Sequence, residues 1–195
     1  MPRTKEITGI ILAGGKSTRM KQDKGLVSFQ GKLMIAHIIE KLESVTKKIM
    51  IITQNPAYEQ FGYPCFADSI KDSGPLGAIY TGLRYSSTQK NLVVGCDTPF
   101  FSVHILNALR ASSGEEAALI AEHNGKKEPL FAIYDRHCLA HFHSCILEGK
   151  LKITDALEQL NSAVINFDEA EWITGNEYAN INTPEELEQF EKFKK

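Results

Sequence analysis

Residues 7–24, ITGIILAGGKSTRMKQDK, decide the fold, because an apolar run passes directly into paired glycines and then into a cationic segment. The apolar residues 10–12 are typical of a buried strand. The glycines at 14–15 let the backbone approach a ligand closely, and successive N–H groups in such a loop form a nest for anionic oxygens. Because Arg19 and Lys24 follow as counter-charges, the stretch predicts a strand that ends in a phosphate-binding loop.

The composition limits the classes of protein to which the chain can belong. Its 195 residues are 43% apolar and 24% charged, which predicts one domain, residues 1–195, with a sizeable core. The net charge of −2 excludes the basic face of a nucleic-acid binder. Residues 1–6 are polar and no apolar run has membrane-spanning length, so we expect a cytoplasmic protein that binds no membrane. The four cysteines, which we expect to be free thiols, are Cys65, Cys96, Cys138 and Cys145.

The hydrophobic pattern along the chain predicts an α/β fold. Residues 33–42 carry apolar side chains at helical spacing, and they are followed by the apolar run 49–52, which is typical of a buried strand. Strand, helix and strand in this order build a parallel sheet. Residues 91–95 add a central strand, whereas 117–121 and 130–134 flank an Asn-Gly turn and predict a hairpin. We therefore expect a three-layer α/β/α domain with a mostly parallel, Rossmann-like sheet and a short antiparallel excursion.

The last helix is marked by a capping signal. Thr183 stands at the N-cap, Pro184 at the first helical position and Glu186 three residues after the cap. Such a threonine and glutamate satisfy each other's backbone N–H groups, and proline is favoured between them. The sequence therefore predicts a helix that starts at residue 184.

Polar segments follow the predicted strands, at the edge where open α/β sheets bind ligands. They are residues 53–56, 68–77 and 96–100. Asp97, directly after a buried run, is the best candidate for a metal ligand, since Mg²⁺ on a nucleotide needs only one or two protein oxygens. A plain turn cap formed with Thr98 is the structural alternative.

Two other kinds of site are suggested by parts of the sequence, a P-loop and a histidine and cysteine metal site. The ending GKST at residues 15–18 is that of a P-loop, but the full motif needs glycine where Ile10 stands. A second candidate is a metal site formed by a histidine and cysteine cluster, for which the spacing matches no zinc pattern and a solvent-facing helix is the alternative. That cluster consists of His137, Cys138, His141, His143 and Cys145.

The sequence also lacks a recognisable protein nucleophile, since GxSxG is absent and no Ser, Cys or His stands out as activated. Transfer of a nucleotidyl group to a phosphate needs none, because the acceptor is already an anion at neutral pH. Positioning and charge neutralisation then suffice.

Taken together, the motifs resemble the molybdenum cofactor guanylyltransferase family over nearly the whole chain. They are LAGGKSTRM with DKG within residues 12–25, DS and GPL within 68–76, CDTPF at 96–100, EPLFAIY at 128–134 and NINTPEEL at 180–187. The first block alone is shared with sugar-nucleotide and cytidylyl transferases, and the double glycine is similar to the guanylyl branch. The resemblance implies a fold of the nucleotide-diphospho-sugar transferase type.

The same resemblance implies an activity and its partners. The family transfers GMP from GTP to the terminal phosphate of molybdenum-molybdopterin, releases pyrophosphate, requires Mg²⁺, and works beside other molybdenum cofactor assembly proteins. By motif, the residues that would contact the nucleotide are Leu12, Ala13, Gly14, Gly15, Lys24, Thr53, Asn55, Asp68 and Asp97. Those that would act in catalysis are Arg19, Lys24 and Asp97. Asp97 would bind the metal with Asn182 as a second candidate, and Asn180 and Asn182 would face the acceptor.

Two departures from the family pattern concern the base. Relatives often have asparagine at the end of the second strand, where this chain has Thr53 with Asn55 two residues on. Relatives commonly read GPLAG, whereas Gly77 precedes Ala78 here. Three alternatives therefore remain open at the sequence level: a transferase that uses another nucleoside triphosphate, one that acts on a phosphorylated sugar, and a GTP-binding adaptor without catalysis.

Overall fold

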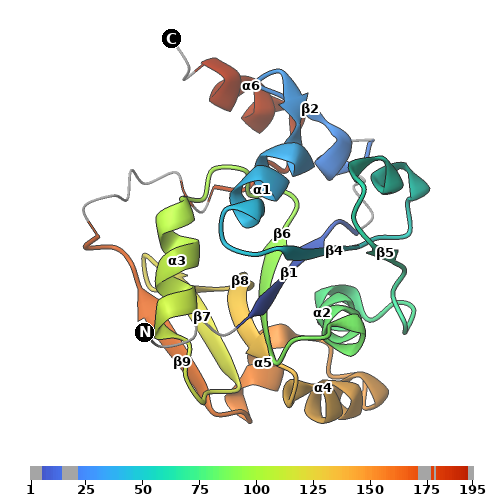
Figure 1. Ribbon diagram of the computed structural model, residues 1–195, viewed down its shortest axis with the longest axis vertical. Helices are drawn as coiled ribbons and strands as arrows, with labels where there is room; N and C mark the ends of the chain where they lie inside the picture. The colour runs from blue at the N-terminus through green and yellow to red at the C-terminus, as the bar shows by residue number, and fades with distance from the viewer. Residues whose placement is uncertain (1–5, 15–21, 171–176, 178, 193–195) are drawn as a thin grey trace.

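A computed structural model of the chain describes residues 6–14, 22–170, 177 and 179–192 (Figure 1). Its centre is a seven-stranded sheet with the order β5-β4-β1-β6-β8-β7-β9. The strands are β1 (Ile7–Leu12), β4 (Lys48–Ile52), β5 (Cys65–Phe66), β6 (Lys90–Gly95), β7 (Ala118–His123), β8 (Lys126–Asp135) and β9 (Ser162–Asn166). The first strand of the chain thus lies near the middle of the sheet.

All strands of this sheet except β8 run in the same direction. β1 pairs in parallel with β4 and β6, and β8 is antiparallel to both β6 and β7. The β7–β8 hairpin turns at Asn124 and Gly125, whose φ values of 51° and 71° match a tight hairpin turn. The mostly parallel sheet and its antiparallel excursion are therefore confirmed.

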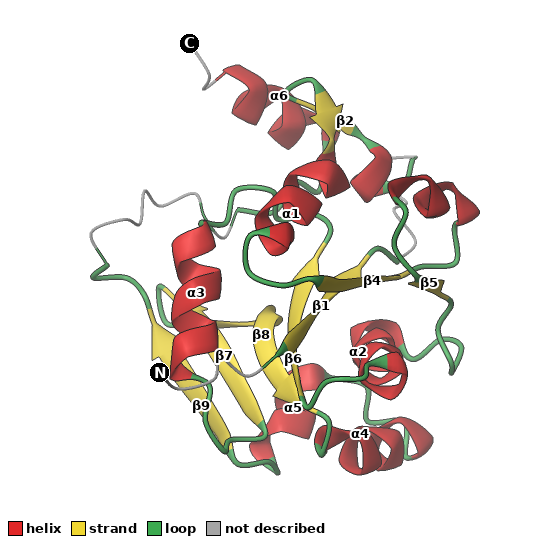
Figure 2. Ribbon diagram, viewed as in Figure 1, coloured by secondary structure: helices red, strands yellow, loops and turns green. Residues whose placement is uncertain are grey.

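Helices cover both faces of the sheet, which makes three layers (Figure 2). Ile10 and Ile11 of β1 are both fully buried and belong to different core clusters, because successive strand residues point to opposite faces. One face carries α1 (Met34–Glu43) and α3 (Val103–Ser112), and the other carries α2 (Gly74–Tyr85), α4 (Cys138–Leu147) and α5 (Ile153–Glu158). Every helix among the described residues is too short or too polar to span a bilayer.

A smaller unit stands beside the main sheet, and the hairpin within it was not predicted. Its parts are a hairpin of β2 (Ser28–Phe29) and β3 (Lys32–Leu33), and the last helix, α6 (Pro184–Lys192). Val27, Phe29 and Ile181 form its apolar core, against which Phe190 packs. Figure 1 shows α6 next to β2, far in sequence but adjacent in space.

The predicted capping signal of α6 is confirmed. The Glu186 N–H donates to Thr183 Oγ1 at 3.2 Å, and the Thr183 N–H donates to Glu186 Oε2 at 3.2 Å. The same carboxylate oxygen accepts the Asn182 N–H at 2.6 Å. The cap therefore fixes the backbone of Asn182 as well as the helix.

Candidate functional site

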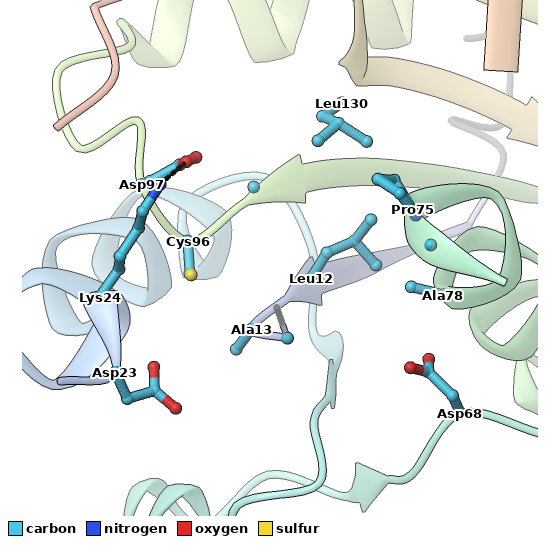
Figure 3. A pocket seen from close by; sticks show the side chains of 13 residues that line it. Leu12, Ala13, Asp23, Lys24, Asp68, Pro75, Ala78, Cys96, Asp97 and Leu130 are labelled. Atoms are coloured by element: carbon cyan, nitrogen blue, oxygen red, sulfur yellow. Dashed lines mark hydrogen bonds and ion pairs between the residues drawn. The ribbon is translucent and has the colours of Figure 1, made fainter. Parts of the chain in front are cut away.

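A pocket of about 270 Å³ opens at the carboxyl ends of β1 and β6, between the chain after β1 and the start of α2. The residues that line it are Leu12, Ala13, Gly14, Asp23, Lys24, Asp68, Gly74, Pro75, Ala78, Gly95, Cys96, Asp97 and Leu130. Figure 3 shows Lys24, Asp97 and Asp23 on one side, and Asp68 facing them from the side of Pro75 and Ala78. The edge of the sheet is where ligands bind in open α/β folds.

Lys24 connects two of the residues that the sequence singled out. Its Nζ donates to Asp97 Oδ2 at 3.0 Å and to Asn182 Oδ1 at 2.6 Å. Lys24 begins a short 3-10 helix, η1 (Lys24–Leu26), whereas Asp97 follows β6 and Asn182 precedes α6. Three segments that are distant in sequence therefore meet at one ammonium group.

The backbone around Asp97 supports this arrangement. A Cβ added at Gly95 would lie 2.9 Å from Asp97 Oδ1, so a larger residue there would displace the Asp97 carboxylate. The Ile181 N–H donates to the Asp97 carbonyl at 2.8 Å, and Thr98 Oγ1 donates to Asn180 Oδ1 at 2.7 Å. The segment 180–182 is thus bonded directly to the loop after β6, and the Asp97 carboxylate pairs with Lys24 rather than capping a turn with Thr98.

Asp23 is a pocket residue that the sequence analysis missed. Its Oδ1 accepts hydrogen bonds from the Tyr58 hydroxyl and from the Gly25 N–H, and its Oδ2 accepts one from Asn55 Nδ2. Tyr58 and Asn55 belong to the second 3-10 helix, η2 (Pro56–Phe61), and its N-cap. The motif DKG contained the signal, but only its lysine was singled out.

Asp68 differs from the other carboxylates in having a buried oxygen without a partner. Among the described residues nothing donates to its Oδ1. Burial raises the pKa of the Asp68 carboxyl above its ordinary value, and a hydrogen bond from Gln54 partly opposes this. An unsatisfied oxygen at a pocket wall is a costly feature unless a ligand supplies a donor.

The two predicted base contacts after β4 are not among the residues that line the pocket. Thr53 is buried, and its Oγ1 accepts the Asn55 N–H at 3.1 Å. Asn55 caps η2, with Oδ1 accepting the Ala57 N–H at 3.0 Å, and its amide donates to Asp23. Both residues thus hold the loop that supports Asp23, and their contact with a nucleotide stays a prediction.

The residues at the end of β1 and directly after it lie at the pocket. Leu12, Ala13 and Gly14 line it, and the Ala13 N–H donates to the Ile52 carbonyl at 2.9 Å. Gly15 and Arg19 lie outside the described residues, so their predicted roles are not tested.

The thiols and the histidine cluster contribute no nucleophile to the described part of this pocket. Burial raises the pKa of the Cys96 thiol, and the nearby Asp97 and Asp23 raise it further, so the thiol stays protonated. Cys138 and Cys145 are buried, free cysteines of the core, and the four cysteines are all free. The side chain of His137 is 86% exposed, whereas His141 Nε2 lies 2.8 Å from the Ala156 carbonyl oxygen and 3.5 Å from Cys145 Sγ. The described residues hold no group of three His, Cys, Asp or Glu side chains that could bind a metal ion.

Comparisons with known proteins agree with this geometry. The family model described as MobA-like NTP transferase domain matches residues 9–164. A probable molybdenum cofactor guanylyltransferase of Flavobacterium johnsoniae is 38% identical over 182 residues, which cover 93% of this chain and 94% of the relative. The molybdenum cofactor guanylyltransferase of Vibrio parahaemolyticus is 33% identical over 186 residues, covering 93% of each chain.

Solved structures extend the likeness to the fold. Molybdopterin-guanine dinucleotide biosynthesis protein A from Archaeoglobus fulgidus superposes with a TM-score of 0.79 at 25% identity, covering 95% of this chain and 97% of that one. A CMP:2-keto-3-deoxy-manno-octonic acid synthetase in complex with CTP has a TM-score of 0.75 at 15% identity and covers 96% of this chain and 98% of its own, a likeness of fold alone.

Proposed function

This chain belongs to the MobA-like NTP transferase domain family and is a nucleotidyltransferase, and from this premise we propose that it transfers GMP from GTP to the terminal phosphate of molybdenum-molybdopterin. The observation that carries the proposal is the junction of Lys24 with Asp97 and Asn182, facing Asp68 across the pocket. One wall offers the Lys24 ammonium for a triphosphate, and the oxygens of Asp97 and Asn182 for a metal ion. The other wall offers a carboxylate suited to the N–H groups of a base.

The proposed reaction is a displacement at the α-phosphorus of GTP. An oxygen of the acceptor phosphate forms a new bond to that phosphorus, the bond to the bridging oxygen of the β-phosphate breaks, and its electron pair leaves with pyrophosphate. Lys24 would neutralise the growing charge on the phosphates, together with Arg19, whose role is taken from the sequence motif alone. Such transfer depends on positioning and electrostatic stabilisation, and the pocket supplies both without a protein nucleophile.

A divalent metal is part of the chemistry of this enzyme family, and we propose Mg²⁺ for this chain. Asp97 Oδ2 and Asn182 Oδ1 already share one cation, the ammonium of Lys24, so two hard oxygen ligands converge there. Asp97 would hold the ion with Asn182 as the second candidate. When bound, the metal would neutralise phosphate charge, and nucleotide oxygens and water would complete its coordination.

The opposite wall accounts for nucleotide recognition in this proposal. Leu12, Ala13 and Gly14 would contact the nucleotide along its length, and Asp68 would accept N–H groups of the guanosine portion. The unpartnered Oδ1 of Asp68 supports this assignment, because a bound donor would remove its desolvation cost. Asn180 is exposed beside Thr98 and, with Asn182, would face the acceptor.

We further propose that residues 1–195 act as one domain. The packing of Phe190 and Leu187 of α6 against the cluster of Val27 and Phe29 supports this, since it joins the last described helix to the segment that follows Lys24. We also propose that the enzyme is cytoplasmic and works with other molybdenum cofactor assembly proteins, because such proteins would supply the proposed acceptor.

The decisive experiment measures pyrophosphate release from GTP and Mg²⁺ with and without molybdenum-molybdopterin. We expect release that depends on the acceptor, and tighter binding of GTP than of CTP or UTP in a parallel titration. Release of inorganic phosphate, or GTP binding without any transfer, would favour the adaptor. Turnover with CTP, or with a sugar phosphate in place of the pterin, would assign a different transferase.

A further inference from the structure

We propose that Asp23 is a positioning residue, which fixes Lys24 in the pocket through hydrogen bonds to η2 and its N-cap. Asp23 directly precedes Lys24 and forms the N-cap of η1. This role concerns the position of Lys24 in the ligand-free protein. It rests on the proposed function only in those experiments that measure enzyme activity.

The hydrogen bonds of Asp23 point to this role. Its carboxylate accepts from three donors: the Tyr58 hydroxyl, the Gly25 N–H at 3.3 Å and the Asn55 amide at 3.1 Å. The Gly25 bond closes the turn that begins η1, and the other two come from η2. The start of η1 is thereby fastened to a second loop that lies about 30 residues later in the chain.

The packing around Tyr58 shows that the network is built into the fold. The Tyr58 side chain is fully buried in the core between the sheet and α1. A Cβ on Gly25 would collide with the Tyr58 hydroxyl, so the glycine leaves the space through which that hydroxyl reaches Asp23. A buried hydroxyl without its acceptor is costly, which makes Asp23 the group that keeps this packing satisfied.

Charge also argues that Asp23 acts through Lys24 rather than on the phosphates. A carboxylate repels a triphosphate, and the oxygens of Asp23 are already occupied by donors from the protein. The ammonium of Lys24, by contrast, extends along the same wall to Asp97 and Asn182. Anchoring the main chain at Asp23 reduces the conformational freedom that Lys24 would lose on binding phosphate.

The bond between Asp23 and Asn55 can be tested by exchanging its donor and acceptor. Asp23→Asn alone places two amide groups against each other, and Asn55→Asp alone places two carboxylates against each other. The double variant restores one donor and one acceptor, keeps an acceptor for Tyr58 and for Gly25, and moves the negative charge away from the pocket wall. Positioning requires the geometry to be restored, whereas a direct electrostatic role requires the charge at position 23.

The primary readout is the acylation rate of Lys24 in the ligand-free protein, measured by mass spectrometry with isotope-labelled acetic anhydride. The Lys24 side chain is 21% exposed and that of Lys152 is 74% exposed, so Lys152 serves as the internal standard. We expect each single exchange to raise the relative rate of Lys24 about fivefold, the change expected from one lost hydrogen bond. The double variant should return to the wild-type rate.

Tyr58→Phe provides a second test, with a matched control elsewhere on the protein. It removes only the hydroxyl, and it should raise the Lys24 rate to a similar extent. Tyr63→Phe removes another tyrosine hydroxyl that donates to a carboxylate, that of Glu43 at the surface, and it should leave the Lys24 rate unchanged. Thermal unfolding of each variant reports whether the fold is retained.

Each outcome either supports or overturns the positioning role. Unchanged Lys24 acylation in the single variants and in Tyr58→Phe would overturn it, as would failure of the double variant to restore the rate. In the pyrophosphate assay, the single variants should lower kcat more than they raise KM for GTP. If wild type shows no GTP-dependent transfer, the proposed function fails, while the acylation rates still decide the role of Asp23.

Discussion

The two walls of the pocket differ in how far their polar groups are already satisfied. On the wall formed by the chain after β1, Lys24 pairs with Asp97 and Asn182, and Asp23 accepts bonds from three donors. On the wall before α2, Asp68 keeps a buried oxygen without a partner among the described residues. One wall is therefore preorganised by the protein, and the other is completed only when a ligand arrives.

This difference corresponds to a division of labour. Phosphates and a metal ion bring strong charge, and stabilising a charge that develops during reaction requires groups that are already in place. A base is distinguished from its competitors by hydrogen bonds that are satisfied only by the correct donors. The wall with Lys24, Asp97 and Asn182 is called the charged wall, and the wall with Asp68 is called the recognition wall. A protein can thus hold the charged wall rigid and leave a polar group of the recognition wall without a partner, at a cost in stability.

The largest effect is expected from removing the carboxylate that anchors the charged wall. Asp97→Ala should lower the rate of GMP transfer about a thousandfold, the scale of losing a group that stabilises transition-state charge. Asp155→Ala, which removes an exposed carboxylate paired with Lys152, is the matched control and should keep full activity. Stopped-flow detection of pyrophosphate gives the rates, and a folded Asp97→Ala protein with near-normal turnover would remove Asp97 from the site.

The second prediction separates the metal from the ammonium on the same wall. Lys24→Met should lower transfer about a hundredfold, because charge neutralisation of the phosphates is lost. In the absence of nucleotide it should bind Mn²⁺ about tenfold more tightly than wild type, since the oxygens of Asp97 and Asn182 no longer share an ammonium. Electron paramagnetic resonance measures the bound Mn²⁺.

Lys152→Met, at an exposed pair, is the control for that measurement. Equal Mn²⁺ binding by Lys24→Met and wild type would mean that the ammonium and the metal occupy different places. The charged wall would then still be preorganised for phosphate through Lys24, but its paired oxygens would not be the metal site.

Asp68→Asn tests how much stability the protein loses by burying the unpartnered carboxylate oxygen of Asp68. The substitution should raise the midpoint of thermal unfolding at pH 7 by about 2–4 °C, because a neutral amide carries a smaller desolvation penalty than a carboxylate. It should also weaken GTP binding about tenfold, since a charged acceptor is lost. A destabilised variant, or one with unchanged GTP affinity, would show that Asp68 is a structural carboxylate.

The gain in stability expected for Asp68→Asn over wild type should grow as pH rises. Burial raises the pKa of this carboxyl in the folded protein above its ordinary value of 3.8. The folded state therefore holds the proton more tightly than the unfolded state. As pH rises from 3.8 through the higher pKa of the folded protein, ionisation of Asp68 destabilises the fold. The difference between Asp68→Asn and wild type should be full at neutral pH and vanish below pH 3.8. Calorimetry at several pH values measures it.

Much of the charged wall could be predicted from the sequence, because its residues follow strands with strong apolar patterns. The apolar run before Gly14 and the one before Asp97 placed two neighbouring strand ends, and the cationic segment after the glycines singled out Lys24. Asp23 and Tyr58 could not be found in this way. Their bond joins two short 3-10 helices, and neither a helical nor an alternating period marks such segments.

The hairpin of β2 and β3 escaped prediction for a related reason. Each strand has two residues, too few for a periodic pattern, and the turn depends on positive φ angles at Gln30 and Gly31 of 49° and 82°. Glutamine is no common signal for such a conformation. The long hairpin at Asn124 and Gly125, by contrast, has both the turn residues and the flanking apolar strands.

The smallest effect is expected at the rim of the charged wall, where Asn180 accepts a hydrogen bond from Thr98. Asn180→Ala should raise KM for the molybdopterin acceptor about fivefold and leave KM for GTP unchanged, if the exposed amide contacts the acceptor phosphate. Thr98→Val removes only the hydroxyl that orients the amide and should raise the same KM about twofold. Steady-state titration of the acceptor at saturating GTP measures both. Equal effects of the two substitutions would reduce Asn180 to a structural partner of Thr98, and the charged wall would then end at Asn182.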